Sequence, residues 1–302
     1  MKFSLIVATL GRVTELARFL ACLDQQTFRD FELIVVDQNP DDRLDPIVGA
    51  YVNSYPLHHL RASPGVSRAR NLGMGQARGE IVGFPDDDCW YLPGTLERLA
   101  KAFEEQPEAD GLTGPCIDDS GVILRRGPRT AARLTKYNLF PRTCAVTMFL
   151  RRDRIASLGG FDETLGPGSG TPWGSAEDHE YIARALAAGA LITYHPDLGV
   201  CHADAPHAFD EHEIQKERAY SRGEGRFLKM HDYSRWYLSY RIARALGGAA
   251  IGAMRADGAK VRYHLSVVVG KLEGWRESCF EVPALRDAGW VSTVVREAKD
   301  DR

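Results

Sequence analysis

The chain of 302 residues, 44% of them hydrophobic and 26% charged, is long enough for one large α/β domain or for one domain with a helical appendage. Its formal net charge of −3 excludes the strongly basic surface that nucleic-acid-binding domains normally carry, so we expect no nucleic-acid partner. An anionic ligand would therefore be held locally, by a metal ion or by individual arginines.

The N-terminal part of the chain alternates between strand and helix patterns. Apolar, β-rich runs at residues 3–8 and 31–36 are each followed by turn-forming residues. Leucines recur at helical spacing over residues 16–23, a weak edge strand is expected at 58–60, and residues 67–77 have a helical composition. This alternation predicts an α/β fold with a Rossmann-like, mainly parallel sheet flanked by crossover helices.

An acidic triplet closes the next apolar run. Residues 80–84 are predicted to form a buried strand, and Asp86, Asp87 and Asp88 follow it. Ligands of open α/β sheets bind at the carboxyl ends of the strands, and Asp37 ends an earlier strand at the same rim. Adjacent carboxylates repel one another unless a cation lies among them, and oxygen ligands suit Mg²⁺ or Mn²⁺. The alternative is a solvated acidic turn.

Six stretches follow one another in the order and at the spacing of the motifs of one enzyme family. They lie at residues 4–9, 33–37, 65–73, 84–88, 159–163 and 176–180. Together they resemble the family 2 glycosyltransferases, which have the GT-A fold. The resemblance implies a catalytic domain over residues 1–205, with a nucleotide-binding half at about 1–117 and an acceptor-side half at about 118–205. Pro85 departs from the apolar residue usual in the family.

By this resemblance, residues at the ends of the first strands would bind the nucleotide. Asp37 would pair with the uracil of a UDP-sugar, since a carboxylate can accept the imide N–H; a turn-forming Asp is the alternative. Thr9 and Arg12 match the loop beside the nucleoside, although Arg12 could equally be a solvated surface charge. Arg70 and Asn71 match positions that orient the base and support the site, on a helix whose charges are often solvent-facing.

The acidic triplet matches the family's Asp-x-Asp pattern. Asp86 would contact the ribose or support the metal shell, Asp88 would ligate the cation directly, and Asp87 would point away. His202 could return to the metal as a further ligand, though a lone His is more often structural. The implied cofactor is a divalent cation, Mn²⁺ or Mg²⁺, that bridges the two phosphates and neutralises the charge on departing UDP.

The acceptor side is expected where a loop rich in Gly and Pro, residues 166–174, leads to Glu177 and Asp178. Acids in the first turn of a helix are favoured by its dipole, which is a structural explanation for this pair. In the family the matching Asp is the catalytic base, so Asp178 would remove the proton of an acceptor hydroxyl. Glu177 and Trp173 would contact the acceptor, although Trp173 could equally fill the core.

The resemblance therefore predicts an inverting, metal-dependent glycosyltransferase that moves a sugar from a UDP-sugar to a hydroxyl of a glycan or a lipid-linked saccharide. A sugar nucleotidyltransferase is an alternative, but the N-terminus lacks the Gly-rich phosphate loop of that chemistry. A non-catalytic carbohydrate-binding protein is another, and the presence of both Asp88 and Asp178 argues against it.

Residues 206–302 carry no assignable motif and are expected to form a helical extension. Residues 236–246 combine aromatic side chains with arginines, as in helices that lie on a membrane surface. The alternative is packing against the catalytic domain or against a second subunit in a homo-oligomer. Six scattered cysteines without a Cys-x-x-Cys pair, and no apolar run of about 20 residues, favour a cytoplasmic protein, at most peripheral at the inner face of a membrane.

Overall fold

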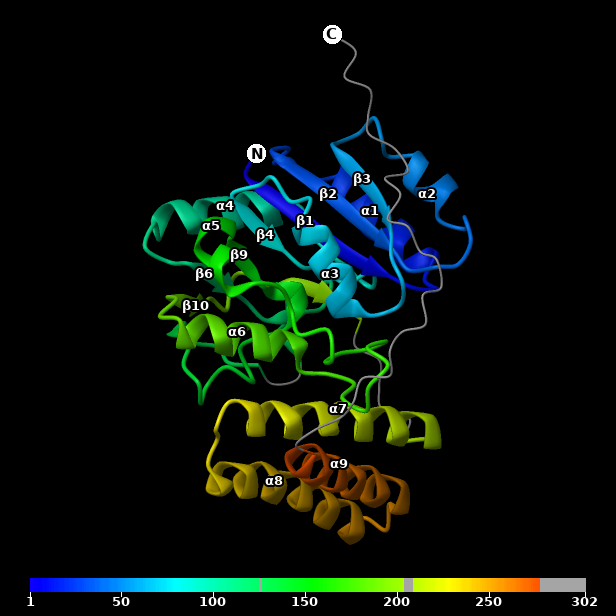
Figure 1. Cartoon of the computed structure of the whole chain (residues 1–302), viewed down its shortest axis with the longest axis vertical. Helices are drawn as coiled ribbons and strands as arrows, with labels where there is room; N and C mark the ends of the chain where they lie inside the picture. The colour runs from blue at the N-terminus through cyan, green and yellow to red at the C-terminus, as the bar shows by residue number, and fades with distance from the viewer. Residues whose placement is uncertain (125–126, 204–208, 278–302) are drawn as a thin grey trace.

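The computed structural model describes residues 1–124, 127–203 and 209–277. The strands of its eight-stranded main sheet are β1 (Phe3–Thr9), β2 (Phe31–Asp37), β3 (Leu57–Arg61), β4 (Ile81–Gly83), β6 (Gly111–Thr113), β8 (Ala132–Arg133), β9 (Phe149–Arg151) and β10 (Ile192–Tyr194). They are ordered β3-β2-β1-β4-β9-β6-β10-β8 (Figure 1). β1 to β4 run parallel, whereas β9 pairs antiparallel with β4 and β6, and β8 with β10. The prediction of a mainly parallel sheet is confirmed.

Helices cover both faces of this sheet. They are α1 (Thr14–Asp24), α2 (Asp45–Gly49), α3 (Val66–Met74), α4 (Thr95–Glu105), α5 (Arg152–Ile155) and α6 (Glu177–Ala187), with short 3₁₀ helices η2 (Ala145–Thr147) and η3 (Ala156–Leu158). Because successive strand side chains point to opposite faces, Phe3, Leu5 and Val7 pack with α1 and α4, while Ile6 packs with α3 and α6. Burial on both faces explains why β1 and β2 are nearly continuous apolar runs.

A small second sheet positions one of the predicted metal ligands. It consists of β5 (Cys89–Trp90), β7 (Cys116–Ile117) and β11 (Val200–His202), in the order β5-β11-β7. β11 runs antiparallel to β5, with His202 opposite Cys89. Because Cys89 directly follows Asp88, this pairing carries His202 to the acidic triplet across more than a hundred residues of sequence.

Three helices follow the catalytic fold: α7 (Glu211–Met230), α8 (Arg235–Met254) and α9 (Gly258–Arg276). They lie side by side below the sheet in Figure 1. Each begins at a side chain that accepts a hydrogen bond from a backbone N–H three residues later, namely Asp210, Ser234 and Asp257. α7 and α9 pack closely, since a Cβ at Gly225 would lie 2.2 Å from the carbonyl oxygen of Lys271.

The predicted helical extension is thus confirmed over the described residues. The predicted domain boundary at residues 205 and 206 lies outside them, as does the end of the extension from residue 278 onward. In the part of the chain that is described, no helix combines the length and the apolar character needed to span a membrane.

Candidate active site

The acidic triplet and His202 form a cluster that suits a divalent cation. One ligand atom from each of Asp86, Asp88 and His202 lies within 4.8 Å of the others. His202 Nδ1 lies 2.8 Å from the backbone carbonyl of Ala203, to which it can only donate, and Nε2 is turned toward Asp88, at 3.4 Å from its Oδ1. A second hydrogen bond that fixes the His tautomer is typical of metal-ligating imidazoles, and two carboxylates with one imidazole fit Mn²⁺.

Arg12 contacts the triplet directly. One of its terminal nitrogens lies 2.7 Å from Asp87 Oδ1 and 2.6 Å from Asp88 Oδ2. Asp87 is not part of the cluster of Asp86, Asp88 and His202, and its buried side chain is turned toward Arg12. Burial raises the pKa of Asp87, and the guanidinium of Arg12 opposes that rise. Arg12 is thus a positive charge of the site, placed beside a predicted metal ligand.

Arg70 connects the triplet to the acceptor side. Its buried guanidinium lies 3.0 Å from Asp86 Oδ1 through one nitrogen and 3.0 Å from Glu177 Oε1 through the other. Burial alone would lower the pKa of Arg70, but the charges of Asp86 and Glu177 raise it. One side chain therefore links the end of β4 to the start of α6.

Asp178 lies in the first turn of α6, after Ala176 in the left-handed region with φ of 76°. Its Oδ1 accepts hydrogen bonds of 2.7 Å from both the backbone N–H and the ring Nδ1–H of His179. Its Oδ2 accepts a 3.2 Å bond from the backbone N–H of Ala145. Burial would raise the pKa of Asp178, but His179 and Arg70 outweigh it and lower the pKa to about 2. Asp178 is therefore ionised at neutral pH, and Oδ2 retains capacity for a further donor.

His179 is a site residue that the sequence reasoning missed. Its ring stacks on Phe140, with centroids 4.9 Å apart, and is held in place beside Asp178. Burial lowers the pKa of His179, but the adjacent Asp178 charge raises it overall. Neighbouring residues of a helix do not normally face each other, so helical spacing gave no signal for this pair. The only signal was a His directly after a candidate base.

Two residues that were predicted to contact the nucleotide, Asp37 and Asn71, form hydrogen bonds with other residues of the chain. Asp37 accepts hydrogen bonds from the backbone and side-chain nitrogens of Asn39 and from His59, and it forms an ion pair with Arg61. A carboxylate has about four acceptor positions, so these partners leave Asp37 little capacity for a base N–H. Asn71 uses both ends of its amide on the backbone of Phe161. Asp37 thus connects β2 to β3, and Asn71 connects α3 to Phe161. Thr9 lies beside Asp37 in the β1–β2 register.

Glu177 and Trp173, the two residues predicted to contact the acceptor, lie in different surroundings. Glu177 lies in the crevice, paired with Arg70, and burial followed by the charge of Asp178 raises its pKa. The expectation of an open aromatic surface at Trp173 is wrong. Its ring is buried, with the guanidinium of Arg226 4.7 Å from the ring centroid and its N–H donating to Glu277. Trp173 packs the catalytic fold against the C-terminal helices, which was the structural alternative.

A comparison with known protein families identifies the family to which the chain belongs. The family model described as Glycosyl transferase family 2 matches residues 4–157, about half of the 302 residues. The chain belongs to glycosyl transferase family 2.

Two curated glycosyltransferases are similar to this chain over parts of its length. An uncharacterized glycosyltransferase of Haemophilus influenzae is 30% identical over 199 residues, 63% of this chain and 64% of that protein. The poly(ribitol-phosphate) beta-N-acetylglucosaminyltransferase TarS of Staphylococcus aureus is 35% identical over 140 residues, 45% of this chain and 24% of TarS. The chain thus spans less than two thirds of the length of these relatives.

Solved structures are similar over most of the chain. A complex of TarS residues 1–349 with UDP-GlcNAc has a TM-score of 0.56 at 23% identity, and covers 91% of this chain and 90% of that one. The mannosyltransferase PcManGT of Pyrobaculum calidifontis, in complex with GDP-Man and Mn²⁺, has a TM-score of 0.59 at 16% identity, with 90% and 87% covered. These similarities confirm the GT-A fold predicted for this family 2 chain.

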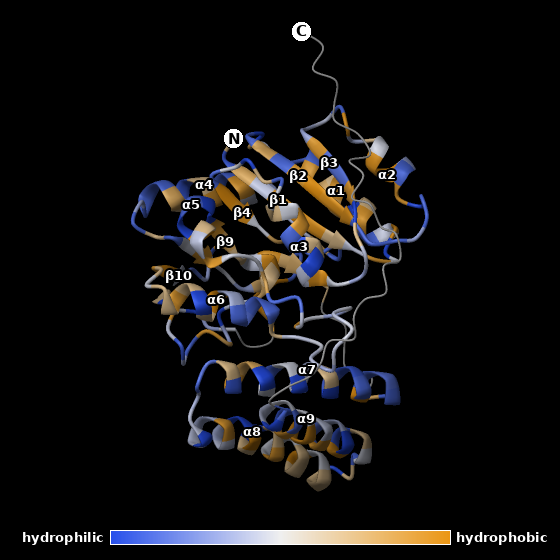
Figure 2. Cartoon of the chain, viewed as in Figure 1, coloured by the Kyte–Doolittle hydropathy of each residue, from blue (hydrophilic) through white to orange (hydrophobic). Residues whose placement is uncertain are grey.

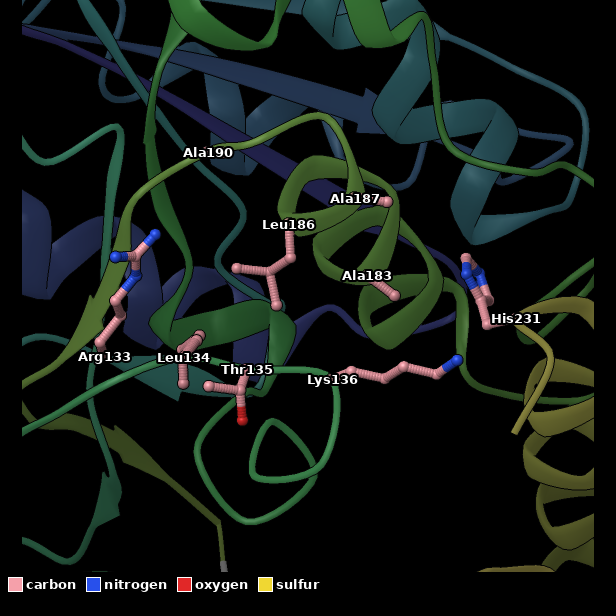
Figure 3. Close-up of a pocket in the computed structure, with 9 residues that line it drawn as sticks. All are labelled: Arg133, Leu134, Thr135, Lys136, Ala183, Leu186, Ala187, Ala190 and His231. Carbon is pink, nitrogen blue, oxygen red and sulfur yellow. The ribbon is translucent and has the colours of Figure 1, made fainter. Parts of the chain in front are cut away.

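A separate cavity of about 510 Å³ lies along α6 of this family 2 chain. Figure 3 shows its wall of small and apolar residues from α6, with Lys136 and His231 at one end and Arg133 at the other. None of the predicted site residues lines this cavity. Asp86, Asp88 and Asp178 therefore lie outside this cavity.

Proposed function

We propose that this family 2 chain is an inverting glycosyltransferase that moves a sugar from a UDP-sugar to an acceptor hydroxyl. The observation that carries the proposal is the bridge made by Arg70, which joins Asp86 of the acidic triplet to Glu177, the residue before Asp178. The proposed cation ligand Asp86 and the proposed base Asp178 would therefore act on the same substrate from the end of β4 and the start of α6, which Arg70 links. This is the arrangement expected of a single displacement, in which leaving group and nucleophile occupy opposite sides of the reacting carbon.

The donor would bind at the carboxyl ends of β1 and β4. Thr9, Arg12 and Asp86 would line the nucleotide, with Asp37, Arg70 and Asn71 holding the surrounding walls. Asp86, Asp88 and His202 would hold Mn²⁺ or Mg²⁺, since their donor atoms cluster and suit either cation. When bound, the cation would supply charge neutralisation for the departing diphosphate. Arg12 would add a second positive charge, because its guanidinium already lies against Asp88.

Asp178 would act as the general base. Its Oδ2, which has one long backbone donor in the structure, would accept the proton of the acceptor hydroxyl. The acceptor oxygen would form a bond to the anomeric carbon while the bond from that carbon to the UDP oxygen breaks, which inverts the configuration. His179 would orient the carboxylate through Oδ1, and Glu177, held by Arg70, would border the acceptor.

The names of relatives suggest where a substrate search should begin. TarS is named as an N-acetylglucosaminyltransferase acting on poly(ribitol-phosphate), and its structure holds UDP-GlcNAc. UDP-GlcNAc is therefore the first donor to test, and a glycan, a polyol-phosphate polymer or a lipid-linked saccharide the first class of acceptor.

The test is UDP release from a panel of UDP-sugars, with and without Mn²⁺, by the full chain. We expect Mn²⁺-dependent release that falls about 10²- to 10⁴-fold in Asp178→Asn, the range typical of a lost general base. Asp153→Asn, at an exposed carboxylate of α5, is the matched control and should release UDP at the wild-type rate. Release that is unchanged in Asp178→Asn contradicts the proposal. Formation of UTP and a sugar 1-phosphate from the UDP-sugar when pyrophosphate is added, without release of UDP, favours the nucleotidyltransferase alternative.

A further inference from the structure

The outward side of α8 is apolar along its whole length. Leu238, Ala245 and Ala249 face inward and are buried, while the opposite side forms a strip that we call the α8 strip. The α8 strip consists of Trp236, Tyr240, Ala243, Gly247, Ala250 and Met254, all exposed. Trp236 is 83% exposed and Met254 is 79% exposed. The strip spans roughly 27 Å at 1.5 Å per residue, far longer than the scattered exposed apolar residues of an ordinary surface.

The neighbouring surface extends this apolar character. Leu246 and Ile251 are exposed on α8 itself, and Leu265 and Val269 are exposed on α9. Figure 2 shows orange, apolar segments along both helices. Both helices lie on the side of α7 that faces away from the sheet (Figure 1). The α8 strip is therefore a face of the molecule that the catalytic fold does not use.

The charged residues of α8 itself are all arginines. α8 contains no Asp or Glu. On and beside α8 there are exposed arginines for which the described residues provide no ion-pair partner. These are Arg235 and Arg244 of α8, Arg255 directly after it, and Arg262 of α9. Glu224 of α7 pairs with Arg241 of α8 and Lys271 of α9, and Glu273 of α9 pairs with Arg218 and Arg222 of α7, so these two acids are already neutralised. The face is thus both apolar and basic.

This charge pattern selects between the two possible occupants of the strip. A second copy packed across a two-fold axis would present the same basic surface to itself, and its arginines would meet without a carboxylate between them, which opposes association. A membrane with anionic phospholipids supplies the missing negative charge at the depth where Trp and Tyr side chains prefer to lie.

We propose that the α8 strip and its flanking arginines dock this chain on the surface of a membrane that contains anionic phospholipid. α8 lies in the plane of the interface with Trp236, Tyr240 and Met254 among the acyl chains, while Arg235, Arg244 and Arg255 contact lipid phosphates. This is the mode of amphipathic helices that rest on a bilayer without crossing it. The inference does not depend on the transferase activity.

The test is co-sedimentation of the full chain with vesicles of phosphatidylcholine alone, or of phosphatidylcholine with phosphatidylglycerol at 3:1. We expect partitioning at least about tenfold stronger with phosphatidylglycerol at low salt, and weaker at high salt because surface charges are screened. The double variant Trp236→Glu with Met254→Glu should lose at least about tenfold of this binding, since it places two acids on the strip. Val122→Glu, at an exposed apolar residue before β8, is the control and should bind as the wild type does.

A second variant guards against a folding defect. Arg244→Gln with Arg262→Gln keeps the α8 strip and removes two cations, so it should weaken binding to phosphatidylglycerol vesicles by about tenfold or more. Equal partitioning into both vesicle types, or no binding at low salt, overturns the proposal. A dimer in sedimentation velocity that the Trp236→Glu, Met254→Glu variant disperses, without vesicle binding by the wild type, also overturns it and assigns the face to a second copy.

Discussion

Replacing Arg70 by Met removes the cation that joins the two halves of the crevice. Met retains much of the apolar stem, but it leaves Asp86 and Glu177 without the guanidinium that lies 3.0 Å from each. Removing one partner of a buried ionic group costs about 3–5 kcal/mol of unfolding free energy. Because the Asp86 carboxylate is 34% exposed, solvent compensates part of its loss, and we expect about 3 kcal/mol. This corresponds to a fall in Tm of roughly 5 °C for a chain of this size.

The assay is urea and thermal unfolding of Arg70→Met beside Arg78→Met, whose arginine is exposed and should cost less than about 0.5 kcal/mol. The double variant Arg70→Met with Glu177→Gln should lose at least about 1 kcal/mol less than the sum of its single variants, because the neutral amide removes one unpaired charge. A loss below about 1 kcal/mol in Arg70→Met, or strict additivity in the double variant, would refute the role of Arg70 as the link.

Three further predictions concern other parts of the site and fold. His179→Phe keeps the ring on Phe140 but removes the Nδ1–H donor, so the pKa of Asp178 rises from about 2; the acid limb of kcat/KM should move to higher pH, and an unmoved limb would contradict this. Asp88→Ala should abolish the Mn²⁺-dependent rise in Tm that UDP gives the wild type; a retained rise places the cation elsewhere. Gly225→Ala brings a Cβ to 2.2 Å from the Lys271 carbonyl oxygen and should lower Tm by several degrees; an unchanged Tm would show that α7 and α9 adjust freely.

Patterns within single elements could be predicted from the sequence. Leu96, Leu99, Ala100 and Phe103 fall on one helical face, and all are buried in α4. The apolar runs of β1 and β2 predict strands, and their carboxyl ends do meet, since Thr9 pairs with Asp37 in register. The clustering of His202 with the triplet required the family resemblance, because the sequence distance alone gave no reason for it.

Contacts between distant segments could not be predicted from residue patterns. Arg70 and Glu177 are 107 residues apart, and neither sits in a pattern that indicates a partner. β9 is a three-residue strand, too short for an alternation that would reveal its antiparallel direction. The burial of Trp173 depends on α7, which supplies Arg226, so a Gly-rich loop sequence could equally have left the indole exposed.

The position of Mn²⁺ in crystals grown with UDP and Mn²⁺ tests the central claim most directly, because Mn²⁺ gives its own anomalous signal. We predict one anomalous peak bound by the carboxylates of Asp86 and Asp88 and by Nε2 of His202, with the UDP phosphates beside it and Asp178 across the crevice. UDP bound away from the acidic triplet, or a Mn²⁺ peak that contacts neither Asp88 nor His202, would contradict the claim.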